Sequence, residues 1–261
     1  MVALSENKSS KFVKLMYIGD SGTGKTGSLV SLVAAGYKLR ILDMDNGVPV
    51  LRNYIQEQCP DNMHLVDYET CRNKYKMTDG GPIVSGAANA YIKATKLMTK
   101  WSDDTVPSEW GPDTVFVLDS LTGLGRSALE WARSMNMNAR DGRQWYNTAQ
   151  RSIETILALL TSDSFECNVI VISHIQYIEN EDEPRRGFAN SVGKALGPII
   201  PSYFNTMICA EMTGIGKNAT RSIRTVPNHL IALKNPAPFK LDEKLPLGTG
   251  LATLFENLKE I

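Results

Sequence analysis

Residues 19–26 carry the residue types and spacing of a phosphate-binding loop. The sequence GDSGTGKT matches the pattern G-x-x-x-x-G-K-[ST] at every constrained position. An apolar, strand-like segment, Phe12–Ile18, precedes it, and a helical pattern, Thr26–Ala35, follows it. A strand, a glycine turn and the start of a helix direct several backbone N–H groups at one anion. We therefore expect the phosphates of a nucleotide, ATP, to be bound by Gly19, Asp20, Ser21, Gly22, Thr23, Gly24, Lys25, Thr26 and Gly27.

Two side chains of this loop and one distant carboxylate have predicted roles in the chemistry. Lys25 is expected to contact the β- and γ-phosphates, and the Thr26 hydroxyl to bind Mg²⁺. The buried run Val115–Asp119 ends in a carboxylate, at the place where one would hold water on Mg²⁺ opposite Thr26. Asp119 or Ser120 alternatively caps the helix that begins at Leu121, and the two roles are compatible.

Two further strand ends carry polar side chains. The second strand closes with LDMDNG, and we expect Asp45, which lies farther out than Asp43, to orient the water that attacks the γ-phosphate. The two aspartates share a face if the strand continues that far. The alternative is that Asp45, Asn46 and Gly47 only form a turn. At the end of Val169–Ser173, His174 is expected to contact the γ-phosphate, or else to be structural.

Composition excludes several classes of protein. Lys and Arg number 28, as do Asp and Glu, so any contact with nucleic acid must come from a local patch. The sequence has no apolar run long enough to span a membrane, and its polar N-terminus does not resemble a secretory signal. Cys59, His64 and Cys71 lie close in sequence, but their spacing fits no common zinc pattern, and isolated thiols are expected.

Alternating strand and helix patterns predict the fold. They indicate an α/β fold with a mostly parallel central sheet, helices on both faces and an antiparallel C-terminal extension. We predict a flexible N-terminus over residues 1–11 and a single domain over residues 12–261. The expected strands are Phe12–Ile18, Leu39–Met44, Met63–Asp67, Thr114–Leu118, Val169–Ser173, Thr206–Glu211 and His229–Leu233. The expected helices are Thr26–Ala35, Val48–Gln58, Ala87–Trp101, Leu121–Met135 and Gln144–Leu160.

Polar loops separate these elements. Ser102–Asp113 is expected to be a surface connection. Three other loops, Thr70–Pro82, Asn136–Arg143 and Gln176–Asn190, are long enough to be functional or disordered. Thr70–Pro82 has no predicted role.

Taken together, GDSGTGKT, LDMDNG, VFVLDS and VIVISH resemble the RecA-like recombinase and helicase branch of P-loop ATPases. The resemblance implies that Asp45 is the catalytic carboxylate, although the family more usually has glutamate, which is longer by one methylene. It implies that His174 is the γ-phosphate sensor. More narrowly, the chain resembles, over roughly residues 12–233, the core-only RecA-like ATPases of tailed bacteriophages that are known as phage nucleotide-binding proteins. Some members of that group act in single-strand DNA annealing or recombination.

The resemblance also implies two DNA-contacting loops. The first offers Arg140, Arg143 and Trp145, a basic and aromatic mixture suited to phosphates and stacked bases. The second offers Arg185 and Arg186, but the acidic residues Glu179, Glu181, Asp182 and Glu183 share that loop. A protein partner for the arginine pair is therefore the alternative.

Another implied feature is a basic residue that reaches the γ-phosphate of a neighbouring subunit. Arg221 and Arg224 are the candidates, and an exposed strand without this role is the alternative.

The sequence thus predicts a DNA-stimulated, homo-oligomeric ATPase that uses ATP and Mg²⁺. It would act on single-stranded DNA in phage recombination, repair or replication, with phage replication or recombination proteins as possible partners, in the cytoplasm of a bacterial host. A small-molecule or nucleotide kinase is one alternative. A nucleotide-gated assembly module, in which Asp45 supports little turnover, is the other.

Overall fold

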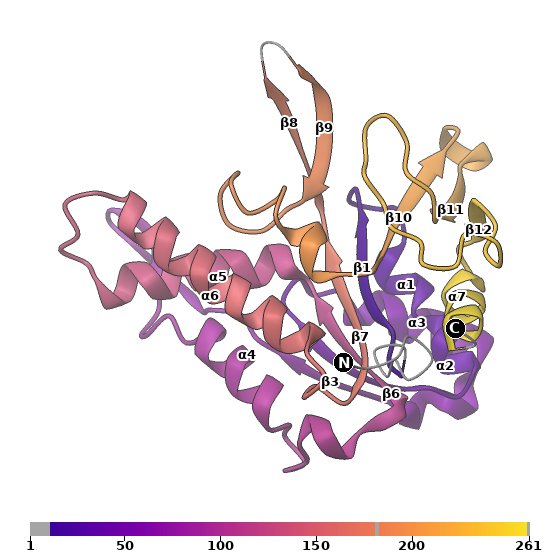
Figure 1. Ribbon diagram of the computed structural model, residues 1–261. Helices are drawn as coiled ribbons and strands as arrows, with labels where there is room; N and C mark the ends of the chain where they lie inside the picture. The colour runs from indigo at the N-terminus through magenta and orange to yellow at the C-terminus, as the bar shows by residue number, and fades with distance from the viewer. Residues whose placement is uncertain (1–10, 181–182, 260–261) are drawn as a thin grey trace, which may run out of the picture.

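The computed structural model describes residues 11–180 and 183–259, and its centre is an eight-stranded sheet (Figure 1). The strand order is β12-β11-β10-β1-β7-β6-β2-β3. The strands from β10 to β3 run parallel, and β11 and β12 are antiparallel additions at one edge. Their bounds are β1 Lys14–Gly19, β2 Lys38–Asp43, β3 Val66–Thr70, β6 Gly111–Asp119, β7 Cys167–Ser173, β10 Thr206–Thr213, β11 Thr220–Arg224 and β12 Lys244–Pro246. This arrangement confirms the predicted fold class.

Helices cover both faces of the sheet because its strands alternate between two cores. Along β1, Met16 and Ile18 join one hydrophobic cluster, whereas Leu15 and Tyr17 join the other. The first cluster lies under α4 (Ala90–Thr99), α5 (Leu121–Met135) and α6 (Arg143–Thr161). The second lies under α1 (Lys25–Ser28), α2 (Val30–Ala34), α3 (Val48–Gln58) and α7 (Gly250–Lys259), on the other side of the sheet in Figure 1. Short 3₁₀ turns occur at Pro60–Leu65, Pro107–Glu109, Ile200–Tyr203 and Gly216–Asn218.

Two segments expected as loops are antiparallel hairpins. The segment 70–82 leads into β4 (Tyr75–Thr78) and β5 (Gly81–Val84). The segment 176–190 forms β8 (Ile175–Asn180) and β9 (Glu183–Ala189), which project from the body of the molecule (Figure 1). Glu181 and Asp182, two of the four acidic residues named above, lie outside the described residues.

The predicted strand His229–Leu233 is wrong, because this segment makes only isolated bridges, such as the one between Ile231 and Gly187. Asn228 explains the difference. Its side-chain oxygen accepts the N–H groups of Leu230 at 2.9 Å and Ile231 at 2.7 Å, which removes donors that a strand ladder needs.

The surface connection predicted at Ser102–Asp113 contributes to the core as well. Its Trp110 is buried and stacks on Phe116 with ring centroids 6.0 Å apart.

Of the predicted flexible N-terminus, residues 1–10 lie outside the described part of the chain, and the single domain over residues 12–261 stays a prediction. Among the described residues, no helix has the length and apolar character needed to cross a membrane.

The parallel strands bring their carboxyl ends to one edge of the sheet. In the register, Asp43 on β2 lies beside Asp119 on β6, and Ser173 on β7 lies beside Ile18 on β1. The residues that follow β1, β2, β6 and β7 are therefore brought together at this edge.

Candidate functional site

The phosphate-binding loop connects β1 to α1 and closes on its own lysine. Gly22 and Gly24 adopt left-handed conformations, with φ of 80° and 92°, which glycine reaches without steric cost. The Lys25 ammonium donates to the carbonyl oxygens of Gly19 at 2.7 Å and Asp20 at 2.9 Å. Burial lowers the pKa of Lys25 from its ordinary value. The loop therefore places a buried cation among backbone groups, as phosphate binding requires.

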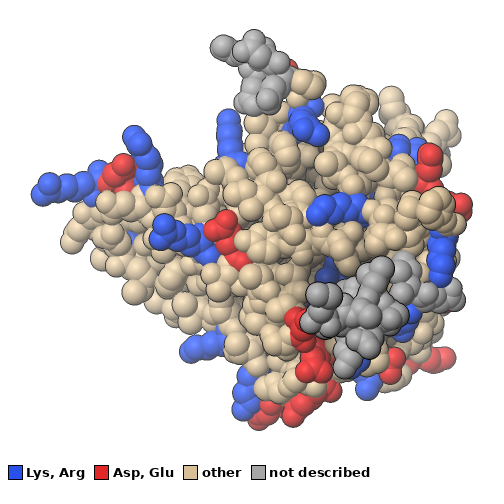
Figure 2. Space-filling model, in the orientation of Figure 1, with Lys and Arg blue, Asp and Glu red and all other residues tan. Residues whose placement is uncertain are grey.

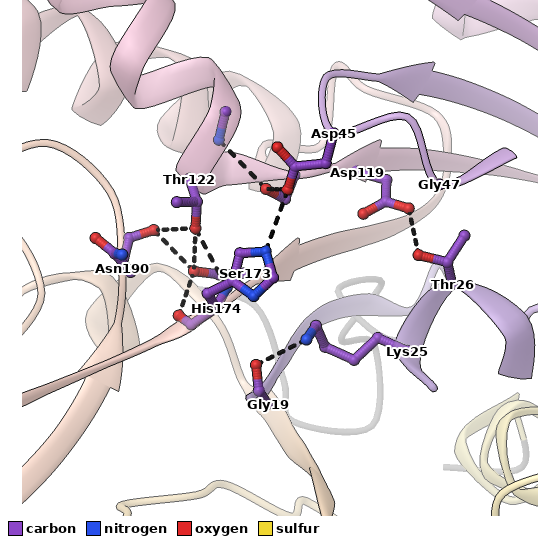
Figure 3. A network of polar contacts seen from close by, with 12 residues as sticks. Gly19, Lys25, Thr26, Asp45, Gly47, Asp119, Thr122, Ser173, His174 and Asn190 are labelled. Atoms are coloured by element: carbon purple, nitrogen blue, oxygen red, sulfur yellow. Dashed lines mark hydrogen bonds and ion pairs between the residues drawn. The ribbon is translucent and has the colours of Figure 1, made fainter. Parts of the chain in front are cut away.

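Thr26 and Asp119 meet at the neighbouring position. The Thr26 hydroxyl donates to Asp119 Oδ2 at 2.6 Å, and Asp119 is only 3% exposed (Figure 3). Burial raises the pKa of Asp119 to about 6, while the hydrogen bond from Thr26 opposes the shift. A hydroxyl and a carboxylate are oxygen ligands of the kind Mg²⁺ prefers, so this pair fits the metal expected here.

Gly47 lines the same corner. A Cβ at this position would lie 2.9 Å from Asp119 Oδ2 and 3.0 Å from Thr26 Oγ1, so a side chain there would fill the space beside both predicted magnesium ligands. The Gly47 N–H donates to Asp43 Oδ1 at 3.1 Å, which fixes the turn. Asp43 is therefore a structural support for this corner.

Asp45 lies beyond the end of β2, so it does not share a strand face with Asp43. Its carboxylate instead faces two partners: Ser120 Oγ donates to Oδ2 in a short hydrogen bond, and His174 Nε2 lies 3.3 Å from the same oxygen (Figure 3). Burial would raise the pKa of Asp45, but the hydrogen bonds from His174 and Ser120 outweigh it and leave the pKa below its ordinary value. The structure thus brings the predicted catalytic carboxylate and the predicted sensor into direct contact.

Ser120, and not Asp119, caps the N-terminus of α5 with its side chain. Its hydroxyl accepts the Gly123 N–H at 3.3 Å at the start of α5, while Asp119 faces Thr26. The capping role and the metal-side role therefore belong to neighbouring residues.

A buried network attaches the β8–β9 hairpin to this site. The Thr122 hydroxyl, on α5, donates to the Asn190 carbonyl at 2.9 Å. The same hydroxyl accepts a hydrogen bond from the His174 backbone N–H at 3.2 Å. Ser173 Oγ donates to the same Asn190 carbonyl at 2.8 Å, and the Asn190 N–H returns to the His174 carbonyl at 2.8 Å (Figure 3). His174 therefore lies between Asp45 and the base of the hairpin.

The hairpin also reaches the phosphate-binding loop directly. Tyr177 on β8 donates its hydroxyl to Asp20 Oδ2 at 3.2 Å, and the Arg185 guanidinium lies 4.2 Å from the centre of the Tyr177 ring. Arg185 and Arg186 are consecutive on β9 and so point to opposite faces of the hairpin. Only one of them can face a given bound strand.

The other predicted DNA-contact residues lie at the far end of α5 and α6. Arg140 and Arg143 are exposed, and Trp145 is half-buried with its indole N–H donating to the Asn136 carbonyl at 2.8 Å. Figure 2 shows positive side chains at this projecting end and on the β8–β9 hairpin, separated by uncharged surface. The structure does not bring the two groups of candidates into one patch.

Arg221 and Arg224 have different surroundings within their own chain. Arg221 Nε donates to the Gly22 carbonyl at 3.1 Å, on its own phosphate-binding loop. Arg224 Nε instead contacts Glu211 Oε1 at 2.5 Å, and both side chains are largely buried. The role of either arginine toward a neighbouring subunit stays a prediction.

Sequence reasoning missed several of these contacts. Gly47 carried a signal, because it follows the strand-end aspartates, but its closeness to Thr26 depends on the fold. Thr122 and Asn190 carried none, since they are separated by 68 positions in the chain. The four cysteines, which all lie in the described part of the chain, are free thiols.

Comparison with known proteins places the chain in a family. A model of the AAA domain matches residues 11–237, which is most of the chain. No curated protein matches the chain.

Solved structures resemble it at low identity. A KaiC-like protein from Pyrococcus horikoshii is 10% identical, with a TM-score of 0.40, and the match covers 81% of this chain and 77% of that one. The flagellar accessory protein FlaH from Methanocaldococcus jannaschii is 10% identical, with a TM-score of 0.43, and the match covers 89% and 83%. An ATPase from the type III secretion system of pathogenic bacteria is 14% identical, with a TM-score of 0.45, and the match covers 76% of this chain and 52% of that one. On the family match and the geometry of its phosphate-binding loop, the chain belongs to the AAA domain family of P-loop NTPases.

Proposed function

We propose that the protein binds ATP with Mg²⁺ and hydrolyses it, and that hydrolysis is coupled to single-stranded DNA. One observation carries the catalytic part: Lys25, Thr26, Asp119 and Asp45, from three different segments, lie at one edge of the sheet (Figure 3). A chance glycine turn would not explain why a lysine, a hydroxyl and two carboxylates converge there.

The side chains have separate roles in this proposal. Thr26 and Asp119 would hold the metal, Asp119 through water, and Mg²⁺ would neutralise charge on the phosphates. Lys25 would leave the carbonyls of Gly19 and Asp20 to contact the terminal phosphates. Asp45 would orient the attacking water once His174 turns from it toward the γ-phosphate.

Coupling to DNA is supported by the path from the site to the candidate DNA contacts. His174 touches Asp45 on one side, and on the other its backbone joins the network that ends at Asn190, where β9 ends. A change at His174 would therefore move the hairpin that carries Arg185 and Arg186. Arg140, Arg143 and Trp145 would add a second contact for the strand.

The assembly of the protein and its biological role are the remaining parts of the proposal. A homo-oligomer, a role in phage recombination, repair or replication, and partner proteins of those processes are proposed from the resemblance of the motifs. Arg221 and Arg224 remain the candidates for a contact between subunits.

The test is ATP hydrolysis by the full chain with and without single-stranded DNA. We expect phosphate release to increase with the DNA and to disappear in Lys25→Ala, because the ammonium is lost from the phosphate site. Lys38→Ala is the matched control, because it removes an exposed lysine. Lys14→Ala would not serve, because Lys14 is half-buried. Turnover that DNA leaves unchanged would refute the coupling to DNA, and turnover that persists in Lys25→Ala would refute the site.

A second candidate is a nucleotide-gated assembly module with little turnover. Asp45 favours it, because this carboxylate is engaged by Ser120 and His174 and its pKa lies below the ordinary value, which makes it a weaker base. Tight ATP binding with little phosphate release, with or without DNA, would support this candidate.

A further inference from the structure

A cavity of about 600 Å³ opens on the side of Asp45 that faces α5. Its walls come from the end of β2, the segment 70–75 that leads into β4, and the first half of α5. We call it the β4 cavity. Its lining includes Arg72, Lys74, Arg126, Tyr75 and Glu130, and none of these belongs to the predicted DNA-contact sets.

The cations of the β4 cavity are not neutralised by ion pairs. Within the described part of the chain, Arg72, Lys74 and Arg126 make no ion pair with a carboxylate. Arg72 donates to a neutral acceptor, Asn46 Oδ1, at 3.2 Å. Two carboxylates, Asp45 and Glu130, also line the cavity, so its three cations leave one net positive charge. This local excess of positive charge favours an anion, although the whole chain has no net charge.

The one carboxylate on α5 in this wall is occupied by the wall itself. Glu130 accepts from the Tyr75 hydroxyl at 2.6 Å and, through its other oxygen, from the Asn73 side-chain amide. Asn73 Oδ1 in turn accepts the Ala90 N–H at 2.9 Å at the start of α4. These bonds fix the backbone of the segment that carries Arg72 and Lys74 between two helices, while the two cationic side chains are exposed beside the cavity.

Tyr75 adds an aromatic surface at the edge of the cavity. The residue is 60% exposed, yet its hydroxyl is tied to Glu130, so the ring is both accessible and restrained. A restrained exposed ring is a platform on which a base can stack, and cations beside such a ring are the usual composition of single-strand binding surfaces.

From these observations we propose that the β4 cavity binds a phosphate of a single nucleic-acid strand, with an adjacent base stacked on Tyr75. The inference rests on the proposed function, which supplies the DNA strand. It adds a contact with that strand that the sequence motifs do not predict. Because Arg126 also faces Asp45, a strand bound here lies next to the predicted catalytic carboxylate.

The test is the binding of a fluorescent oligo-dT to the full chain, followed by anisotropy at several salt concentrations. We expect the double variant Lys74→Ala/Arg126→Ala to bind about tenfold more weakly and to lower the salt slope by about one to two, because two phosphate contacts are lost. The matched control, Lys38→Ala/Arg52→Ala, removes one exposed lysine and one exposed arginine away from the cavity and should bind within about twofold of the wild type.

Tyr75 separates stacking from charge. Tyr75→Ala should weaken oligo-dT binding about tenfold with an unchanged salt slope, whereas Tyr75→Phe, which keeps the ring, should lose much less. Thermal denaturation and affinity for a fluorescent ATP analogue would show that each variant is folded.

Three outcomes would overturn the inference. If the double variant binds oligo-dT like its control, the cavity does not hold the strand, although the DNA part of the proposed function survives. If the wild type binds no oligo-dT, both fail together. If Tyr75→Ala binds oligo-dT as tightly as Tyr75→Phe, no base stacks on the Tyr75 ring.

Discussion

Asp119 shows how a single residue can be costly for the fold and useful for the site. It is almost fully buried and accepts a hydrogen bond from Thr26, but among the described residues no cation forms an ion pair with it. Burial accounts for the raised pKa of about 6. A metal cation would stabilise this buried, ionised carboxylate, because its charge would replace the hydration that burial removes.

Asp119→Asn is expected to stabilise the nucleotide-free protein at neutral pH. The carboxyl binds its proton more tightly in the folded state, with a pKa of about 6 against 3.8, so the wild type loses stability as the pH rises from about 4 to about 6. Asparagine keeps an acceptor for Thr26 without the charge and should gain up to about 3 kcal/mol at pH 7. Thermal denaturation from about pH 4.5 to 7.5 would check this, and a less stable variant at pH 7 would contradict it.

Gly47→Ala is expected to weaken binding of magnesium nucleotide by about tenfold or more, because the new methyl would lie against Asp119 and Thr26. Gly47 has φ of −82°, so alanine can adopt its backbone and the effect is steric. Gly80→Ala is the matched control, since a Cβ there meets nothing within 4 Å. Titration with a fluorescent ATP analogue would compare the two, and equal affinities would show that the corner is not the metal site.

At the scale of elements, the β8–β9 hairpin is connected to the nucleotide side at two points. Its base is held by the hydroxyls of Thr122 and Ser173 at the Asn190 carbonyl. Its first strand reaches Asp20 through Tyr177. One anchor point lies beside His174 and the other on the phosphate-binding loop, which makes the hairpin a candidate for a moving part that responds to nucleotide.

Thr122→Val is expected to lower stability by about 1 kcal/mol, or the melting temperature by roughly 2–4 °C, because a buried hydroxyl with three polar partners is replaced by a methyl. Amide hydrogen exchange across 175–189 should also become faster, since one anchor of the hairpin is lost. Thr155→Val removes an exposed hydroxyl that bonds only within α6 and should change neither measurement. Equal exchange in the two variants would show that Thr122 does not hold the hairpin.

At the scale of the molecule, the antiparallel edge of the sheet folds back over the nucleotide side. Strand β11 follows β10 in the sheet order, and its Arg221 bonds the Gly22 carbonyl of the same chain. A Cβ at Gly24 would lie 2.6 Å from Leu247, which follows β12. The C-terminal third therefore contacts the loop that the N-terminal third builds.

Arg221→Ala is expected to weaken nucleotide binding about threefold to tenfold at every protein concentration, because the arginine contacts the phosphate-binding loop of its own chain. Arg224→Ala is the comparison, since it breaks the contact with Glu211 and should mainly lower thermal stability. Titration with a fluorescent ATP analogue over a wide range of protein concentration would test this. An effect of Arg221→Ala confined to concentrations at which the wild type assembles would instead support a contact between subunits.

Local patterns in the sequence determined much of this molecule. The phosphate-binding loop, the strand that ends at Asp119 and the alternation of strands with helices depend on neighbours in the chain, and the structure reproduces them. The expected helix Leu121–Met135 has the same bounds as α5. Spacing within a segment is enough for such features, because hydrogen bonds and side-chain direction repeat over a few residues.

Only the tertiary structure decided which distant side chains meet. Register and packing between distant segments decide the contact of Asp45 with His174 and the contact of Arg221 with the phosphate-binding loop of its own chain. They also decide the hairpins that form within two segments predicted as loops. The strand predicted at His229–Leu233 failed for a related reason, because one asparagine side chain satisfied the backbone donors locally. Sequence periodicity reports which face of an element is buried, whereas the partner across the interface is set by the whole fold.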